Sequence, residues 1–390
     1  MDFDELIERR NTHSAKWDIM EERYSISKEE GIPMHVAEMD FKPPKVIQEK
    51  LGDLLSHGFY GYFADYSNYH SSIKWWMKIR HNWDVGESKI FTVHGLVNGM
   101  ALCVDAFTSS GDEIIMLTPM YHAFFNVLNA TDRVIREFPL KLEEDKYILD
   151  FSKYKKLLTG KEKMLIFCSP HNPGGRVWEI EELQEVAKFC SENDLLLVSD
   201  EIHHVLIMPG YTHNVMAVAA PEINDRLIML TSNTKTFNIA GAHTGNVTIS
   251  NLDLADVFEE KMKALGLSPN TLGLHMATAG YSTGGAEWLD NLLVYIAENF
   301  RIFDSGINNI PGCKAMHAEG TYLAWVDFSG TGMTQAEIKN RIETVAKITT
   351  VYGSIMGEGG GAFMRFNIAT PRSRVLEAVE RMQNAFKDLQ

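Results

Sequence analysis

One lysine in the sequence stands where a reactive amine could serve catalysis. Lys235 lies within residues 231–241 and follows the apolar run 227–230. Short apolar runs of this kind are typical of buried strands in a parallel sheet, and ligands bind beyond the carboxyl ends of such strands. A lysine at that position can form an imine with an aldehyde cofactor. An ordinary surface loop with one lysine fits this segment equally well, so the interpretation depends on the other strands.

Three further apolar runs stop abruptly at polar side chains. The run from residue 114 ends at Tyr121, the run from residue 164 ends near Asn172, and the run from residue 195 ends at Asp200 and His203. Helical stretches lie between the runs, as they do between parallel strands. The carboxyl ends of parallel strands meet at one edge of the sheet. We therefore expect an aromatic ring, an amide, a carboxylate, an imidazole and the lysine amine to converge there.

This set of groups matches what pyridoxal 5'-phosphate (PLP) requires of a protein. Lys235 would hold the aldehyde of PLP as a Schiff base, and Asp200 would keep the pyridine nitrogen protonated, so that the ring draws electrons from a substrate. Asn172 and His203 can bond to the edge of the ring that carries the 3-oxygen, and Tyr121 can stack on its face. The alternatives are a structural histidine at a strand end and an ordinary buried aromatic.

The phosphate of such a cofactor needs hydrogen-bond donors, and residues 93–99 offer a glycine turn that opens a helix. Backbone N–H groups at the start of a helix suit an anion. Leu96 and Val97 are expected to donate from the main chain, and Ser232 and Thr234 to add hydroxyl groups. A plain turn between a loop and a helix explains the same pattern equally well.

Five motifs give the chain a family resemblance. They are residues 169–178 (SPHNPGGRVW), 199–203 (SDEIH), 235–241 (KTFNIAG), 319–327 (EGTYLAWVD) and 364–373 (MRFNIATPRS). Together they resemble fold-type I PLP enzymes of the class I/II aminotransferase superfamily and, more narrowly, the MalY/PatB branch of cystathionine β-lyases. The similarity extends from about residue 16 to near the C-terminus. It implies an α/β fold of the aspartate aminotransferase type, with a large doubly wound, mixed or mostly parallel sheet and a smaller α+β domain.

The resemblance assigns roles to further residues. Arg365, with Asn172, would bind the α-carboxylate of an amino-acid substrate, since a guanidinium matches a carboxylate in two-point geometry; without the resemblance, a structural salt bridge is the better interpretation. Tyr62 would reach the phosphate in a neighbouring subunit, which makes a homodimer the expected active unit. Many aminotransferases carry an arginine eight residues after the lysine, whereas this chain has His243 there. The compensation of the phosphate charge is therefore expected to differ.

The patterns along the chain predict three regions. Residues 1–45 lack a strong period and are expected to form an N-terminal arm that contributes to the small domain, residues 46–281 the large PLP-binding domain, and residues 282–390 the C-terminal small domain. In the last region we predict a helix over 288–309 and short strands over 321–328 and 362–369. The substrate would bind in the cleft between the domains.

Composition narrows the possible functions and partners. The chain has 390 residues, a net charge of −15 and four cysteines without paired or ligand-like spacing. An acidic surface argues against a nucleic-acid partner, and the cysteine pattern favours a reducing compartment and no metal site. The N-terminus lacks the layout of a secretion signal and no apolar run approaches a membrane span. A cytoplasmic enzyme without membrane contact is the expectation.

Two reactions use the same residues. In both, the freed Lys235 acts as general base at the substrate Cα, with a pKa lowered by cationic neighbours and partial burial. A leaving group on Cβ gives elimination to a thiol, pyruvate and ammonia, whereas return of the proton to the cofactor gives transamination of an L-amino acid. Typical aminotransferases more often carry tyrosine at the position of His203, which favours a C–S β-lyase for cystathionine or related cysteine conjugates. A regulator acting through protein contacts and a PLP-binding protein without turnover are further alternatives.

Overall fold

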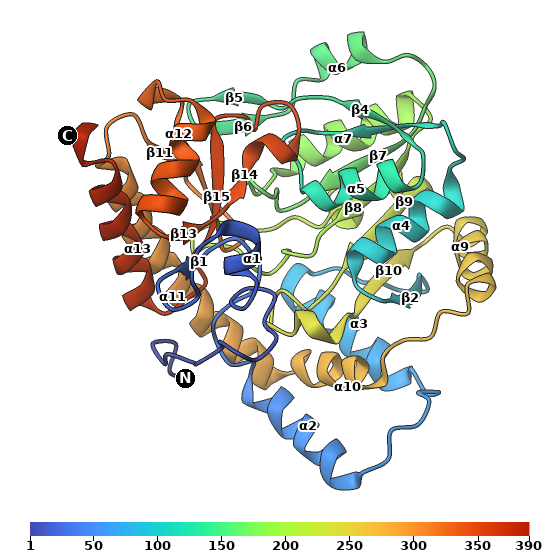
Figure 1. Cartoon of the computed structure of the whole chain (residues 1–390). Coiled ribbons are helices and arrows are strands. Elements are labelled where there is room, and N and C mark those ends of the chain that lie inside the picture. The colour runs from blue at the N-terminus through green and yellow to red at the C-terminus, as the bar shows by residue number, and fades with distance from the viewer. Residues whose placement is uncertain (390) are drawn as a thin grey trace.

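A seven-stranded sheet forms the centre of the larger part of the molecule (Figure 1) in the computed structural model, which describes residues 1–389. Its strands, in their order across the sheet, are β2 (Lys89–Val93), β10 (Gly245–Ile249), β9 (Leu227–Thr231), β8 (Leu196–Asp200), β7 (Glu162–Cys168), β3 (Glu113–Met116) and β4 (Val134–Glu137). From β9 to β4 neighbouring strands are parallel, and β10 runs antiparallel to both β9 and β2. The expected mixed, mostly parallel sheet is confirmed.

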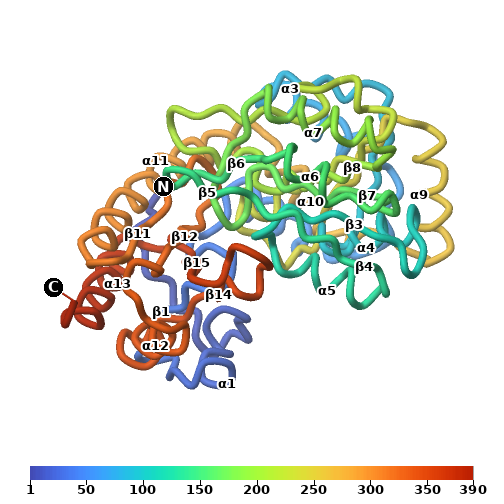
Figure 2. Tube along the Cα trace, turned by 90° about the horizontal axis from the view of Figure 1, so that it is seen from above, coloured from blue at the N-terminus to red at the C-terminus, as the bar shows by residue number. Residues whose placement is uncertain are grey.

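The central strands are apolar because helices cover both faces of the sheet. All residues of β9 are buried, and so are the last four of β8. Figure 2 shows α4 (Leu96–Phe107) and α5 (His122–Ala130) on one side of the sheet and α7 (Ile180–Glu192) on the other. Parallel strands enclosed in this way lose the alternation of polar and apolar residues and are read as continuous apolar runs. This is the pattern from which the strands could be predicted.

A smaller sheet lies beside the larger one. It is antiparallel, and its strands in order are β11 (Lys314–Ala315), β12 (Leu323–Asp327), β15 (Phe363–Asn367) and β14 (Val351–Tyr352). The long helix α11 (Thr283–Asn308) packs against α13 (Arg372–Ala385) and β11. Helix α11 starts earlier than the predicted residue 288, because the hydroxyl of Ser282 accepts the N–H of Gly285 and caps a first turn that the sequence leaves without large apolar residues.

The remaining elements are short strand pairs and surface helices. The pairs are β1 (Ile32–Pro33) with β13 (Ile348–Thr349) and β5 (Lys141–Glu143) with β6 (Lys146–Ile148). The helices are α1 (Met20–Tyr24), α2 (Lys45–His57), α3 (Ser67–His81), α6 (Phe151–Leu157), α8 (Met216–Ala219), α9 (Leu252–Ala264), α10 (Thr271–Gly280) and α12 (Gln335–Lys339). Short helical turns are η1 (Pro221–Arg226), η2 (Ala240–Ala242), η3 (Ser329–Thr331), η4 (Asn340–Val345), η5 (Gly353–Met356) and η6 (Lys387–Leu389).

The N-terminal residues run across the molecule as an irregular segment before α2 begins. Strand β1 pairs in parallel with β13, which joins this segment to the C-terminal part of the chain. Figure 1 shows the segment in dark blue between the small sheet and the rest. The predicted domain limits at residues 45 and 281 stay a prediction. All four cysteines are free and buried. Within residues 1–389, no helix combines the length and the apolar character that crossing a bilayer requires.

Candidate active site

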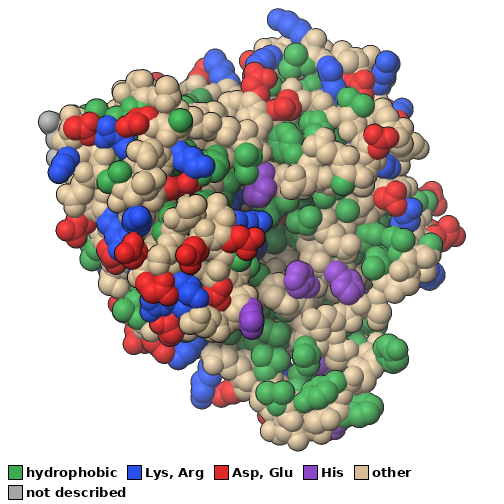
Figure 3. Space-filling view, in the orientation of Figure 1, with side chains coloured by type: hydrophobic (Ala, Val, Ile, Leu, Met, Phe, Trp, Pro, Cys, Tyr) green, Lys and Arg blue, Asp and Glu red, His purple; other side chains and the backbone are tan. Residues whose placement is uncertain are grey.

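The polar residues predicted at the strand ends meet at one rim of the large sheet. Asp200 is the last residue of β8, Asn172 follows β7, Lys235 follows β9, and Tyr121 directly precedes α5. They line a cavity of about 260 Å³, and Figure 3 shows a hollow between the two parts of the molecule with histidine side chains beside it. The lining residues are Ala37, His94, Gly95, Leu96, Val97, Tyr121, Phe124, Asn172, Asp200, Ile202, His203, Thr234, Lys235, Ala240 and His243.

The amine of Lys235 is set for chemistry near neutral pH. Burial, followed by the nearby Arg365 cation, lowers the pKa of Lys235 from 10.5 to about 8. Nζ donates a hydrogen bond to the carbonyl oxygen of Ala37 at 2.5 Å. We expected cationic neighbours and partial burial to lower this pKa, and burial is the larger cause. A useful fraction of the amine is therefore neutral and able to act as a nucleophile or base.

Asp200 is a buried carboxylate without a cationic partner. Burial raises its pKa from 3.8 to about 7, and the N–H of Ile202 donates to it at 3.2 Å. No ion pair joins Asp200 to another residue within 1–389. A buried carboxylate of this kind is costly unless a positive group pairs with it. The protonated ring nitrogen of PLP is such a group, so the carboxylate fits this cofactor.

Asn172, His203 and Arg365 form the next part of the site. Arg365 lies buried on β15, and its NH1 donates to Oδ1 of Asn172 at 2.9 Å. Burial, followed by the Lys235 and Arg365 cations, lowers the pKa of His203 to about 3, so its imidazole is neutral. Among residues 1–389, neither Nδ1 of His203 nor Nε of Arg365 has a hydrogen-bond partner. His203 lines the cavity, whereas Arg365 is absent from its wall and contacts it through Asn172. An unpartnered buried nitrogen beside a cavity fits a polar ligand.

Another part of the cavity wall suits an anion. Leu96 and Val97 are the first residues of α4, and the turn before them places Gly95 at φ 84°, a left-handed conformation that favours glycine. The first N–H groups of a helix have no partner within the helix and carry partial positive charge. Thr234 and His243 also line the cavity. The phosphate of PLP fits these donors.

Ser232 is placed differently from the other predicted phosphate donors. It is absent from the cavity wall, and its hydroxyl donates to the carbonyl of Thr244 at 2.6 Å. The same oxygen accepts the N–H of Thr234 at 3.1 Å. The position of Ser232 therefore supports the shape of the loop, and its contact with phosphate stays a prediction.

Tyr121 and Tyr62, the two aromatic residues predicted to contact the cofactor, line different cavities. Tyr121 lines the cavity and packs edge-on against Phe124, with ring centroids 5.5 Å apart. Tyr62 is 96% exposed and lines a separate hollow with Phe63 and His275. Within residues 1–389, no side chain covers the ring of Tyr62.

Sequence reasoning missed two contributors to the site. Ala37 contributes its carbonyl oxygen to Lys235, and Asn238 bonds to the backbone of Met39 and Phe41. Backbone groups carry no signal in the sequence. Asn238 lies within the motif at residues 235–241, which was the available indication that its position matters.

Comparison with known proteins agrees with this geometry. Residues 31–382 match the family described as aminotransferase class I and II, and the chain belongs to that family. It is 32% identical over 388 residues to cystathionine beta-lyase PatB of Bacillus subtilis, covering 99% of this chain and 100% of PatB. The family resemblance drawn from the motifs is confirmed.

Two solved structures with this fold are of a PLP-containing protein and of a C-S lyase. Cystalysin from Treponema denticola, which contains a pyridoxal 5'-phosphate cofactor, has a TM-score of 0.95 and 38% identity over 100% of this chain and 99% of its own. The PLP-bound C-S lyase from Staphylococcus hominis has a TM-score of 0.91 and 28% identity over 99% and 98%. The expected fold-type I architecture is confirmed.

Proposed function

We propose that this chain is a PLP-dependent carbon–sulfur β-lyase that cleaves cystathionine or a related cysteine S-conjugate to a thiol, pyruvate and ammonia. The observation that carries the proposal is one cavity that joins the Lys235 amine, the unpaired Asp200 carboxylate and the start of α4. The full-length similarity to PatB, which is named a cystathionine beta-lyase, supports the lyase reaction.

The residues of the cavity, together with Arg365 behind Asn172, would divide the work of holding cofactor and substrate. Bound PLP would supply an electron sink that stabilises negative charge at the substrate Cα. Lys235 would hold its aldehyde carbon, Asp200 would keep its ring nitrogen protonated, and the first N–H groups of α4 would bind its phosphate. Arg365 would bind the substrate carboxylate through its guanidinium fork, with the Asn172 amide beside it. Asn172 and His203 would bond to the ring edge that carries the 3-oxygen.

Lys235 then acts on the substrate as a proton carrier. Once the substrate amine has replaced Lys235 on the aldehyde carbon, the neutral lysine amine removes the Cα proton. The resulting ammonium would then protonate the departing sulfur. The Cβ–S bond breaks, the thiol leaves with the proton, and water converts the remaining three-carbon fragment to pyruvate and ammonia. The reaction consumes one water and needs no keto acid. Transamination would use the same residues and is the alternative.

A pair of substrates separates the two reactions. L-cystathionine carries sulfur on Cβ, whereas L-norleucine has an unbranched side chain without a leaving group on Cβ. We expect the PLP-loaded enzyme to release pyruvate from cystathionine and to leave norleucine unchanged, with or without a keto acid. Conversion of both amino acids only when a keto acid is added would assign the chain as an aminotransferase.

The proposal also includes the oligomeric state of the enzyme and its location in the cell. The exposed Tyr62 is suited to reach the phosphate site of a second subunit in a homodimer. Four buried free cysteines favour a reducing compartment, and we propose the cytoplasm. An acidic net charge of −15 is consistent with small-molecule substrates and no nucleic-acid partner.

A further inference from the structure

Residues 35–41, here called the strap, connect the two charged groups expected to meet the substrate. The carbonyl oxygen of Ala37 accepts from Nζ of Lys235 at 2.5 Å and from the hydroxyl of Tyr322 at 3.0 Å. Two residues earlier, the carbonyl oxygen of His35 accepts from NH2 of Arg365 at 3.4 Å. The position of the strap backbone therefore affects the lysine amine and the guanidinium together.

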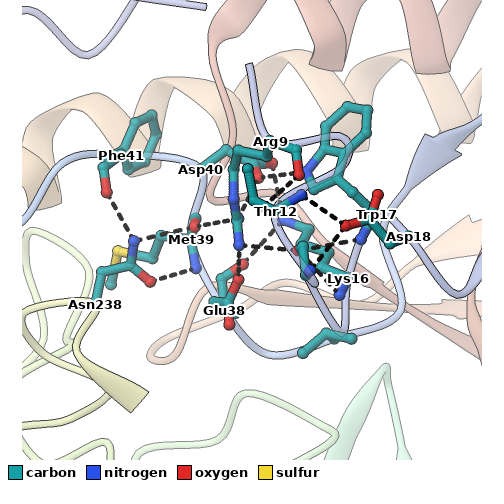
Figure 4. A network of polar contacts seen from close by, with 12 residues as sticks. Arg9, Thr12, Lys16, Trp17, Asp18, Glu38, Met39, Asp40, Phe41 and Asn238 are labelled. Carbon is teal, nitrogen blue, oxygen red and sulfur yellow. Dashed lines mark hydrogen bonds and ion pairs between the residues drawn. The ribbon is translucent and has the colours of Figure 1, made fainter. Parts of the chain in front are cut away.

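Asn238 docks the lysine loop onto the strap. Its Oδ1 accepts the N–H of Met39 at 2.9 Å, and its Nδ2 donates to the carbonyl oxygens of Met39 at 3.0 Å and Phe41 at 2.7 Å (Figure 4). Asn238 has φ 54°, and this left-handed backbone turns its amide toward the strap. Three hydrogen bonds thus hold the loop three residues after Lys235.

Asp40 anchors the same end of the strap, between the two residues that Asn238 contacts. Its carboxylate is buried and accepts from Nζ of Lys16 at 2.8 Å, NH1 of Arg9 at 2.8 Å and Nε1 of Trp17 at 3.1 Å (Figure 4). Lys16 is itself fully buried and donates to the carbonyl oxygen of Glu38 at 2.9 Å. A buried carboxylate with this many donors has one well-defined position, which fixes the backbone beside it.

The small sheet holds the opposite side of the strap. Nδ2 of Asn367, at the end of β15, donates to the carbonyl oxygens of Val36 at 2.7 Å and Glu38 at 2.6 Å. The N–H of Asp40 donates to the carbonyl oxygen of Ala369 at 2.9 Å. The strap is therefore bonded to the small sheet along one side and to the lysine loop along the other.

We propose that Asn238 is a positioning residue, which holds the strap against the lysine loop so that the Ala37 carbonyl fixes the free amine of Lys235 at the place where it meets cofactor and substrate. Asp40 and its donors keep the strap in register for this task. The inference rests on the proposed function only in assigning Lys235 as the reacting amine. A misplacement of about 1 Å in a reacting group can cost on the order of a hundredfold in rate.

The test compares two asparagines, the half-buried Asn238 and the buried Asn299, that each bond to backbone carbonyl groups. Asn238→Gly keeps the left-handed backbone and removes the three hydrogen bonds. Asn299→Ala is the control, since Asn299 lies on α11, outside the cavity wall, and its Nδ2 donates to the carbonyl oxygens of Ile368 at 3.1 Å and Thr370 at 2.9 Å. Capture of PLP by the cofactor-free protein is followed by absorbance, and kcat and KM are measured on the loaded enzyme.

We expect Asn238→Gly to slow PLP capture by about tenfold or more and to lower kcat by a similar factor, while KM changes less than about threefold. Asn299→Ala should lower the thermal midpoint while both rates stay within about twofold of wild type. If Asn238→Gly does not fold, Asn238→Asp keeps the shape and the acceptor, loses both donors and should show the same slowing. Rates within twofold of wild type in the Asn238 variant, or an equal slowing in Asn299→Ala, would overturn the proposal. PLP capture requires no substrate, so this result can be interpreted even if the chain is not a lyase.

Discussion

Burial moves the pKa values of Lys235 and Asp200 toward each other. The lysine falls to about 8 and the carboxyl group rises to about 7, because burial disfavours the charged form of each. The pKa values of a basic group and an acidic group therefore both lie near neutral pH, where proton transfer is efficient.

The lowered pKa of Lys235 predicts that the rate of PLP capture depends on pH. Only the neutral amine attacks an aldehyde, and below the pKa its fraction falls tenfold per pH unit. We expect the rate of PLP capture by the cofactor-free protein to rise with pH up to about 8 and to level off above it. Replacing Arg365 with Met removes a cation that lowers this pKa and should move the midpoint upward. A midpoint near the ordinary value of 10.5 in wild type would contradict the burial argument.

Replacing the Asp200 carboxylate should lower turnover with little effect on folding. Asp200→Asn keeps the size of the side chain but cannot pair with a protonated ring nitrogen, so we expect kcat to fall by about a hundredfold or more. The variant should still fold, since its amide is easier to bury than a carboxylate. Asp194→Asn is a matched control, because the Asp194 side chain is 97% exposed before the same strand. Equal kcat values in the Asp200 variant and wild type would remove Asp200 from the mechanism.

A buried ion pair joins the loop after β7 to the segment before β12. Arg176, in the loop after β7, contacts Glu319, in the segment before β12, with 3.1 Å between Nε and Oε2. The two side chains are only 4% and 7% exposed, and Oε2 also accepts the N–H of Val177 at 2.8 Å. This pair connects the loop that carries Asn172 to the smaller sheet.

Removing one partner of that pair should destabilise the protein. Glu319→Ala leaves the Arg176 guanidinium with one fewer buried acceptor, and we expect the free energy of unfolding to fall by about 3 kcal/mol. Urea unfolding followed by tryptophan fluorescence measures the change. Glu298→Ala, in an exposed pair with Arg301 on α11, should leave the unfolding midpoint where it is. Equal behaviour of the two variants would show that the buried pair contributes nothing beyond a surface contact.

At the scale of the whole molecule, the exposed Tyr62 makes the assembly testable. Tyr62→Ala and Lys235→Ala should each be inactive or nearly so, for different reasons. If Tyr62 serves the neighbouring site, a mixed dimer has one site with both changes and one site with neither. An equal mixture should then recover about a quarter of wild-type activity, since half of the dimers are mixed and one site in two is intact. No recovery after confirmed subunit exchange would place Tyr62 in its own site or in none.

The sheet and most of its rim could be predicted from the sequence because their signals are local. An apolar run and the polar residue that ends it lie within ten positions, as at Asp200. The strap could not be predicted, since Lys235 meets a backbone oxygen 198 residues away and Asn367 one 331 residues away. The start of α11 was missed because capping by Ser282 replaces the apolar period there. Ser232 has the right residue type, but its hydroxyl is used inside the loop.

We propose that this cavity performs elimination at a carbon–sulfur bond with Lys235 as the reacting amine. Its most direct test counts the thiol and pyruvate released per subunit when PLP-loaded protein meets L-cystathionine without a keto acid. We expect many equivalents of each, in equal amounts, from wild type and none from Lys235→Ala. A single equivalent that resumes only when a keto acid is added, or equal release by the Lys235 variant, would contradict it.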